Sequence, residues 1–216
     1  MKTLEPTDKT KAGRLSDRAS YSLQDIYSIL DDSFVCSIAF TVIGEVYIIP
    51  TCYGREGNSI YFHGSALSRM NRNLKEGMDV CISVTNVDAV VLARSAFHHS
   101  INYRSVILFG RPGELVSDPE KTNGLKIITE HIIPGRWNDV RPPDANELKA
   151  TSVFSLQINE ASAKVRSGGV KDDPADKDAG VWAGLLPFKI IAGEPIPDPA
   201  LKEGIPVPEY IKDYKK

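Results

Sequence analysis

The residues best suited to chemistry gather first in one short segment. Residues 61–74 read YFHGSALSRMNRNL, with His63, Ser65, Ser68 and Arg69 in close succession. We expect a strand to end at His63 and a helix to begin near Ser65, where free backbone N–H groups favour an anion. The segment is therefore a candidate phosphate site. The alternative is a capped surface helix with solvated arginines.

A second segment, residues 97–110, reads FHHSINYRSVILFG and places Arg104 and Ser105 at the start of an apolar strand. An arginine there can approach a phosphate or a ring carbonyl. The adjacent His98 and His99 would point to opposite faces of a strand, so they cannot simply share one metal. Since the cysteines and histidines show no zinc-type spacing, we predict no metal site.

A third candidate lies near the C-terminus, in NEASAKVRSGG and VWAGLLP. Lys164 and Arg166 share one face if the segment is extended. Trp182 lies in an apolar, glycine-containing turn. A basic pair and a tryptophan can flank an anionic aromatic ligand, but they can equally be a solvated strand edge and a core anchor.

The sequence offers no side-chain nucleophile of a known kind. It contains no GxSxG motif, no recognised Cys–His arrangement and no evident carboxylate pair. It also lacks the GxGxxG and GxxxxGK[ST] nucleotide-binding motifs. A phosphate site without a nucleophile suggests that a cofactor carries the chemistry.

Length and charge narrow the class of protein. The chain has 216 residues, enough for one well-buried domain, and a net charge of −2, which gives no general attraction to nucleic acid. No apolar run reaches the roughly 18 residues that span a bilayer, and the N-terminus lacks a secretory signal. Three cysteines without a close pair are typical of reduced thiols. We expect a cytoplasmic protein that binds neither membranes nor nucleic acid.

The elements that must position these residues are mostly short strands. Periodicity and turn signals predict strands over residues 33–40, 45–53, 58–64, 80–84, 88–94, 102–116 and 152–158. The strand over 102–116 is expected to bend at residues 110–113, because Pro112 cannot donate to a ladder. Helices are predicted over residues 22–30, 65–76 and 117–132. This pattern indicates a mainly-β closed or split barrel and disfavours a doubly wound fold.

Three regions are expected along the chain. Residues 1–20 are polar and predict an N-terminal arm. Residues 21–192 carry the expected elements and predict the folded domain. Residues 193–216 are rich in proline and predict an extended tail that wraps a surface or a partner subunit.

Taken together, four stretches resemble the pyridoxamine 5'-phosphate oxidase-like FMN-binding split-barrel family, in the branch related to nitroimidazole-resistance proteins. They are residues 60–69 (IYFHGSALSR), 89–110, 133–143 (IPGRWNDVRPP) and the pair EASAKVRSGG and WAGLLP. The resemblance implies a six-stranded split barrel of the FMN-binding type. It also implies a homodimer that holds FMN noncovalently at the subunit interface.

The resemblance further implies a role for each candidate residue. The phosphate and ribityl chain would be surrounded by His63, Ser65, Ser68 and Arg69. The isoalloxazine edge would be followed, mainly by backbone groups, at Pro50, Thr51 and Cys52. The flavin would be reached from one strand by Arg104 and Ser105, and the cleft closed by Lys164, Arg166 and Trp182. His63 is the candidate catalytic residue, with a simple hydrogen-bonding role as the alternative.

These expectations define several possible functions. The first is an FMN-dependent oxidoreductase with a small-molecule electron donor and acceptor. Alternatives are a flavin carrier or sensor without turnover, a haem-binding or haem-degrading relative, and a barrel that carries an apolar ligand. Met70 follows Arg69 where the true pyridoxamine-phosphate oxidases have a basic residue, and the tail lacks their short arginine motif. Both departures argue against oxidation of the vitamin.

Overall fold

The computed structural model describes residues 2–214, and they form ten strands, all paired antiparallel, and five α-helices. The chain forms two compact units. Unit 1 comprises residues 2–50, 80–110 and 158–189, and unit 2 comprises residues 51–79, 111–157 and 190–214. Within the described residues, no helix combines the length and apolar character needed to cross a bilayer.

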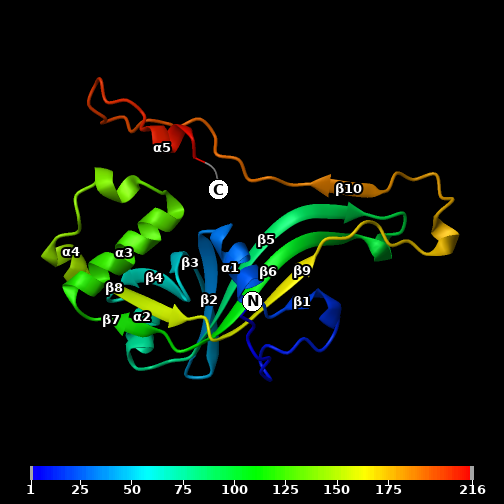
Figure 1. Cartoon of the computed structure of the whole chain (residues 1–216), viewed down its shortest axis with the longest axis horizontal. Coiled ribbons are helices and arrows are strands. Elements are labelled where there is room, and N and C mark those ends of the chain that lie inside the picture. The colour runs from blue at the N-terminus through cyan, green and yellow to red at the C-terminus, as the bar shows by residue number, and fades with distance from the viewer. Residues whose placement is uncertain (1, 215–216) are drawn as a thin grey trace. The chain divides into compact units, whose positions relative to one another are not determined.

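Unit 1 is a sheet with one helix on it. Its strands follow the order β1-β9-β6-β5-β2, and β10 lies along the outer part of β5 (Figure 1). The bounds are β1 (Ala19–Ser20), α1 (Leu23–Asp31), β2 (Val35–Val42), β5 (Val80–Leu92), β6 (Ser100–Gly110), β9 (Glu160–Arg166) and β10 (Gly184–Pro187). Short 3-10 turns, η1 (Ser16–Arg18), η2 (Ala96–His98) and η4 (Pro174–Asp176), lie between them. The long β5–β6 ladder lies in the interior of this sheet, between β9 and β2.

The core of unit 1 follows from alternation in these strands. One face of the sheet carries Ile38, Ile82 and Leu108, and the apolar side of α1 supplies Ile26 and Leu30; all are at most 1% exposed. The i, i+4 spacing of the two helical residues places them on one side of the helix, against β5, β6 and β9. Burial of such side chains stabilises the fold by roughly 1.5–3 kcal/mol each.

Unit 2 has strands in the order β3-β4-β8-β7 and carries most of the helices. Strand β3 begins in unit 1 and continues into unit 2. The bounds are β3 (Glu45–Glu56), β4 (Ser59–Ser65), α2 (Arg69–Lys75), β7 (Gly113–Leu115), α3 (Asp118–Ile132), η3 (Arg136–Asp139), α4 (Ala145–Ala150), β8 (Thr151–Gln157) and α5 (Glu209–Lys212). Phe62 and Phe154 stack at 5.6 Å between ring centroids on one face of this sheet.

Two glycines let α3 lie close to the opposite face. A Cβ at Gly54 in β3 would come within 2.7 Å of the Ile127 carbonyl oxygen in α3. A Cβ at Gly124 in α3 would come within 2.7 Å of Val153 in β8. Since both contacts are far below van der Waals distance, only glycine allows the helix this approach.

Several predicted elements are confirmed. Helix α1 begins after Ser22 as expected, although the Ser22 side chain makes no capping hydrogen bond within the described residues. Helix α3 carries the predicted capping box, in which Ser117 and Glu120 exchange hydrogen bonds and Pro119 lies in the first turn. Helix α2 begins at Arg69, four residues later than predicted.

Two expectations about the strands are wrong, and three strands were not predicted. Residues 80–84 and 88–94 are not separate strands but parts of β5, because a bulge between Val87 and Ala89 absorbs the irregular step. Residues 102–116 are not one bent strand. They divide into β6, which pairs in unit 1, and β7, which pairs in unit 2, because the chain departs from the ladder at Gly110 and Pro112. Strands β1, β9 and β10 were not foreseen.

The two chain ends have structure of their own. The N-terminal segment lies along β9, with Ala19 opposite Lys164 and the Thr7 hydroxyl donating to Glu160 at 2.6 Å. The tail has no strand within residues 190–214 and forms α5, where the Tyr210 hydroxyl donates to Asp139 at 2.7 Å. The predicted boundaries at residues 20 and 192 stay predictions.

Candidate functional site

A cavity of about 410 Å³ in unit 2 is built around His63. Strand β4 alternates, so Ile60 and Phe62 face the core while Tyr61 and His63 face α3. The cavity lining is mostly apolar, with a few polar side chains: His63, Leu125, Ile128, Thr129, Trp137, Arg141, Pro143 and Glu147. A concave apolar site with few polar groups is the usual form of a ligand site.

Helix α3 and the following loop make the far wall. Leu125, Ile128 and Thr129 lie at i, i+3 and i+4, so one stripe of the helix faces the cavity. The Thr129 hydroxyl donates to the Leu125 carbonyl at 2.9 Å, which occupies its proton within the helix. The Glu130 carboxylate accepts from the backbone N–H of Trp137 at 2.7 Å and thereby fixes the start of the loop.

His63 is the one imidazole of this cavity's lining. Burial lowers its pKa below the ordinary value, so the ring is neutral at pH 7. Its Nδ1 is buried and finds no hydrogen-bond partner within residues 2–214. A buried polar atom without a partner is uncommon in folded proteins and points to a group that the protein alone does not supply. A neutral imidazole is also a good ligand for a metal centre.

Arg141 and Glu147 bring charge to the rim of the cavity. The guanidinium donates to both carboxylate oxygens, at 2.8 and 2.6 Å. Hydrogen bonds from Arg141 and from the Asp144 backbone lower the pKa of Glu147 to about 2. The pair is exposed and salt-screened, so it contributes little to stability and is available to a ligand at the rim.

In the predicted phosphate segment at residues 65–69, the serine side chains and a backbone N–H group already form hydrogen bonds within the protein. The Ser68 hydroxyl accepts from the Asn71 N–H at 3.1 Å, and the Ser65 hydroxyl accepts from the Leu67 N–H at 3.3 Å. The Ser68 N–H donates to the Ser65 carbonyl at 3.0 Å. Arg69 is exposed. The capped-helix alternative therefore describes this segment well, and its phosphate role stays a prediction.

The residues predicted at the isoalloxazine edge lie on β3. Pro50 is exposed in unit 1, and Thr51 and Cys52 are half-buried in unit 2. The Thr51 hydroxyl donates weakly to the Cys52 carbonyl at 3.4 Å. Their place at the isoalloxazine edge stays a prediction.

In unit 1, the residues predicted to bind the cofactor from β6 and β9 do not all lie on the same face of the sheet. Ser105 lies directly opposite Lys164 in the β6–β9 ladder, and its hydroxyl donates to the Lys164 carbonyl at 3.4 Å. Arg104 is the neighbouring residue and points to the other face. There it binds Asp88 at 2.8 Å and Asp32 at the end of α1, and these carboxylates raise its pKa. Ser105 and Lys164 are thus brought together, whereas Arg104 joins an ion-pair network.

Arg166 and Trp182 also lie in unit 1, in contrasting surroundings. Arg166 is 8% exposed and donates from Nη1 to the Asn102 side-chain oxygen and to the Ile101 carbonyl. Trp182 is 67% exposed and rests against Gly184, where a Cβ would lie 2.7 Å from the ring. Arg166 is therefore a buried cation, while Trp182 is an exposed aromatic.

A cluster that sequence spacing did not reveal lies at the end of the β5–β6 hairpin. Ligand atoms of His98, Asp173 and Asp176 fall within 4.8 Å of one another. The Ser95 hydroxyl lies 2.8 Å from Nδ1 of His98. The acidic residues are 75 or more positions further along the chain, which is why a search for local ligand spacing missed them.

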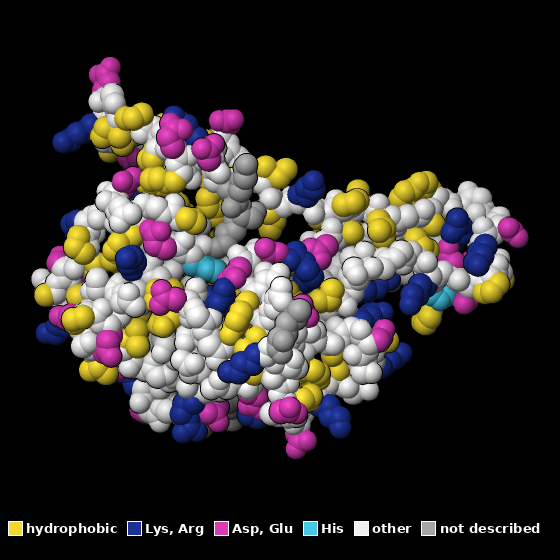
Figure 2. All heavy atoms as spheres, in the orientation of Figure 1, with side chains coloured by type: hydrophobic (Ala, Val, Ile, Leu, Met, Phe, Trp, Pro, Cys, Tyr) yellow, Lys and Arg dark blue, Asp and Glu magenta, His cyan; other side chains and the backbone are white. Residues whose placement is uncertain are grey.

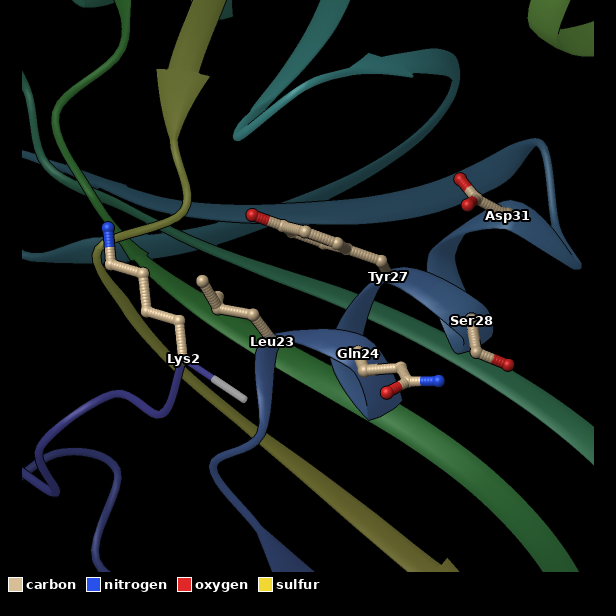
Figure 3. Close-up of a pocket in the computed structure, with 6 residues that line it drawn as sticks. All are labelled: Lys2, Leu23, Gln24, Tyr27, Ser28 and Asp31. Carbon is tan, nitrogen blue, oxygen red and sulfur yellow. The ribbon is translucent and has the colours of Figure 1, made fainter.

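A second cavity, of about 580 Å³, lies over α1 in unit 1 (Figure 3). Leu23 and Tyr27 extend from one side of the helix, and Lys2 approaches them from the N-terminal segment. No residue predicted to bind the cofactor lines this cavity.

The fold resembles those of proteins with known structures. The flavocytochrome Anf3 from Azotobacter vinelandii is 35% identical, with 98% of this chain and 99% of that chain covered and a TM-score of 0.91. An FAD- and haem-binding protein from Mycobacterium smegmatis is 34% identical, with 90% and 96% covered and a TM-score of 0.86. A 5-nitroimidazole resistance protein homologue from Bacteroides thetaiotaomicron, at 19% identity, covers 79% and 90% with a TM-score of 0.59 and supports the fold alone. No curated protein matches the chain by sequence.

These similarities define the class of the fold as the pyridoxamine oxidase-like split barrels. The chain belongs to the pyridoxamine 5'-phosphate oxidase family, whose model matches residues 22–165. The expected mainly-β split-barrel fold is confirmed. Sequence reasoning singled out His63 but missed the rest of its cavity, although the segment IPGRWNDVRPP contains Trp137, Arg141 and Pro143.

Proposed function

We propose that this protein binds a flavin nucleotide and a haem and acts as an electron-transfer oxidoreductase. The observation that carries the proposal is His63, a neutral imidazole with a buried, unpartnered Nδ1 that lines an apolar cavity. Two relatives about one-third identical over nearly the whole chain support it, since one is described as a flavocytochrome and the other as binding FAD and haem.

The residues of the His63 cavity fit a haem. His63 would supply a neutral imidazole to bind a haem iron, because burial keeps its pKa low. Leu125, Ile128 and Trp137 offer apolar and aromatic walls. Arg141 at the rim is a partner for a carboxylate such as a haem propionate, and its present partner Glu147 is exposed and can release it.

Residues of unit 1 support the proposal that the protein binds a flavin. Lys164 and Arg166 lie two positions apart on β9, and Ser105 lies opposite Lys164 on β6. Together they present two cations and a hydroxyl to an anionic ligand. Arg166 has no carboxylate ion pair within residues 2–214, so it keeps charge for a phosphate.

The family resemblance favours FMN, whereas the Mycobacterium smegmatis relative is described as binding FAD. Either flavin satisfies the proposed function. A bound flavin supplies two-electron transfer and a bound haem supplies one-electron transfer. The small-molecule donor and acceptor would meet these cofactors, while the role of the chain is to hold them, exclude water and keep His63 neutral.

We also propose that the functional unit is a homodimer in the cytoplasm. Strand β10 pairs with β5 on one side, and within residues 2–214 its other edge has no partner strand. Beside this edge, Trp182, Leu186 and Phe188 are 67%, 52% and 49% exposed. Figure 2 shows hydrophobic side chains gathered along the segment labelled β10 in Figure 1. An unpaired edge beside exposed apolar residues suits a second copy of the chain.

The first experiment is an absorption spectrum of the purified protein, followed by separate titrations with haem, FMN and FAD. We expect flavin bands and a haem Soret band. The His63→Ala variant should lose the Soret band, while His98→Ala, outside the cavity, should keep it. Chromatography of the released flavin identifies it as FMN or FAD.

The results separate the alternatives. Oxidation of a nicotinamide donor with reduction of an acceptor supports the oxidoreductase. Bound flavin without turnover supports a carrier or sensor. If neither flavin nor haem binds, the proposed function is wrong, and an apolar ligand in the His63 cavity becomes the next candidate.

A further inference from the structure

The β5–β6 hairpin ends in the 3-10 turn η2, whose last residue, His98, holds its imidazole between a hydroxyl and an acid. Its Nδ1 lies 2.8 Å from the Ser95 hydroxyl oxygen. Its Nε2 lies 3.9 Å from a carboxylate oxygen of Asp173, which is too far for a hydrogen bond. Within residues 2–214, Nε2 forms no hydrogen bond. One ring nitrogen is therefore fixed by the protein, while the other faces an acid without binding it directly.

Two acids come to this place from the turn η4 (Pro174–Asp176). Asp173 directly precedes the turn, and the Asp176 N–H donates to the Asp173 carbonyl at 3.0 Å. The ligand atoms of His98, Asp173 and Asp176 all lie within 4.8 Å of one another. In the described part of the chain, no lysine or arginine forms an ion pair with either acid. Since two like charges this close repel each other, a cation among them would be stabilising.

A separate ion pair holds η4 beside the hairpin. The Asp172 side chain is 3% exposed and accepts from the Arg94 backbone N–H at 2.9 Å and from Arg94 Nη1 at 2.7 Å. Figure 1 shows the segment between β9 and β10 beside the far end of β5 and β6. Because Asp172 directly precedes Asp173, this contact sets the position of the acids and uses none of the three ligand groups.

The spacing of the three groups suits a metal ion. Zinc bonds to nitrogen and oxygen are about 2.0–2.2 Å long, so two ligands of a tetrahedral zinc ion lie about 3.4 Å apart. The 3.9 Å from Nε2 to Asp173 is close to that value, and Asp173 is exposed and free to rotate inward. A metal on Nε2 leaves the proton on Nδ1, which then donates to Ser95, as is usual for a metal-bound histidine.

The neighbouring histidine takes no part. The His99 Nδ1 accepts from the Ala93 backbone N–H at 3.3 Å, so this ring is engaged elsewhere in the hairpin. The set is therefore one imidazole nitrogen and two carboxylates, without a thiolate. Imidazole favours zinc and related transition metals over calcium and magnesium, and the absence of sulfur disfavours copper(I).

We propose that His98, Asp173 and Asp176 bind a zinc ion, which fastens the segment before β10 to the end of the β5–β6 hairpin. The three protein ligands leave one position of a tetrahedral ion to water. The site revises the expectation from local spacing, which predicted no metal site. It is independent of the flavin and haem binding proposed above.

The test is a calorimetric titration of Zn²⁺ into the full-length protein after treatment with a chelator. We expect one ion per chain. His98→Ala and Asp173→Asn should each weaken Zn²⁺ binding about tenfold or more, and the exposure of Asp173 makes its variant safe for folding. Asp178→Asn, an exposed acid of the same segment outside the cluster, is the matched control and should stay within about twofold.

Two further measurements separate this site from other places where zinc binds. His63→Ala should bind Zn²⁺ as tightly as the native protein, because His63 lies in unit 2. Saturating Zn²⁺ should raise the Tm of the native protein but not that of His98→Ala, since only a ligand that binds the folded state stabilises it. The proposal is overturned if the native protein shows no saturable Zn²⁺ binding, if His98→Ala keeps the native affinity, or if Ca²⁺ binds more tightly than Zn²⁺.

Discussion

The guanidinium of Arg104 donates two hydrogen bonds to the carboxylate of Asp88, from Nη2 to Oδ1 at 2.8 Å and from Nε to Oδ2 at 3.1 Å. A second carboxylate, Asp32 at the C-terminal end of α1, binds the remaining Nη1. Arg104 therefore ties the helix to β5 and β6. This geometry gives a structural reason for an arginine at a position that the family resemblance assigns to the flavin.

Replacement of Arg104 tests which role dominates. Arg104→Gln should lower the free energy of unfolding by about 1–2 kcal/mol, a value reduced because all three side chains are partly exposed. Flavin affinity of the folded variant should stay within about twofold, because the neighbouring Ser105 points to the other face. Urea unfolding and flavin titration measure the two effects. A stable variant that loses the flavin would restore Arg104 to the cofactor site.

A second prediction concerns the close approach of α3. Gly54→Ala should destabilise the protein by about 1–3 kcal/mol, because the added methyl would meet the backbone of Ile127 and Ile128 at 2.7 Å. Gly113→Ala is the matched control. It also lies on a strand of unit 2, but nothing lies within 4 Å of its Cβ, so its effect should be within about 0.5 kcal/mol.

Thermal unfolding of both alanine variants measures the difference. Since α3 forms a wall of the His63 cavity, Gly54→Ala should also weaken haem binding, whereas Gly113→Ala should not. Equal stabilities for the two variants would show that the helix can move away from the sheet at little cost.

The parts of the fold that the sequence revealed are those with local signals. The capping box at Ser117 and Glu120 and the apolar spacing of α1 depend on residues within a turn or two of each other, and both helices were predicted. The unforeseen β9 has alternating small and charged residues, EASAKVR, which bury little on their own. Its strand form depends on pairing with β6 about 60 residues away, a contact that periodicity does not encode.

The residues of the candidate sites divide in the same way, into those with a local sequence signal and those that depend on distant contacts. His63, Lys164 and Arg166 were recognised from residue type and family resemblance. Trp137 and Arg141 follow α3 in an irregular loop, and their place in the cavity depends on Glu130 binding the loop backbone.

The low pKa of His63 predicts an acid sensitivity of the folded state. The unfolded chain protonates this imidazole near its ordinary value of about 6.5, whereas burial keeps the folded form neutral to lower pH. Between the two pKa values the unfolded state binds more protons, so the free energy of unfolding should fall as pH decreases through this window. Haem-free His63→Gln should lose less stability than the native protein from about pH 7.5 to about pH 5.

Urea unfolding at a series of pH values provides the measurement. Groups that titrate equally in both proteins cancel in the difference between the two curves. Parallel curves for native protein and His63→Gln would mean that His63 is protonated as readily in the folded as in the unfolded chain.

The edge of β10 gives the last prediction, on assembly. Leu186 is 52% exposed on a strand whose free edge lies beside Trp182 and Phe188. Leu186→Glu places a charge in the proposed contact between two copies, and burying an unpaired carboxylate is costly. Light scattering after size exclusion should show the native protein as a dimer and the variant as a monomer. Val116→Glu, at a residue 77% exposed in unit 2, should stay dimeric. A dimeric Leu186→Glu variant would place the contact elsewhere, and a monomeric native protein would remove the homodimer from the proposed function.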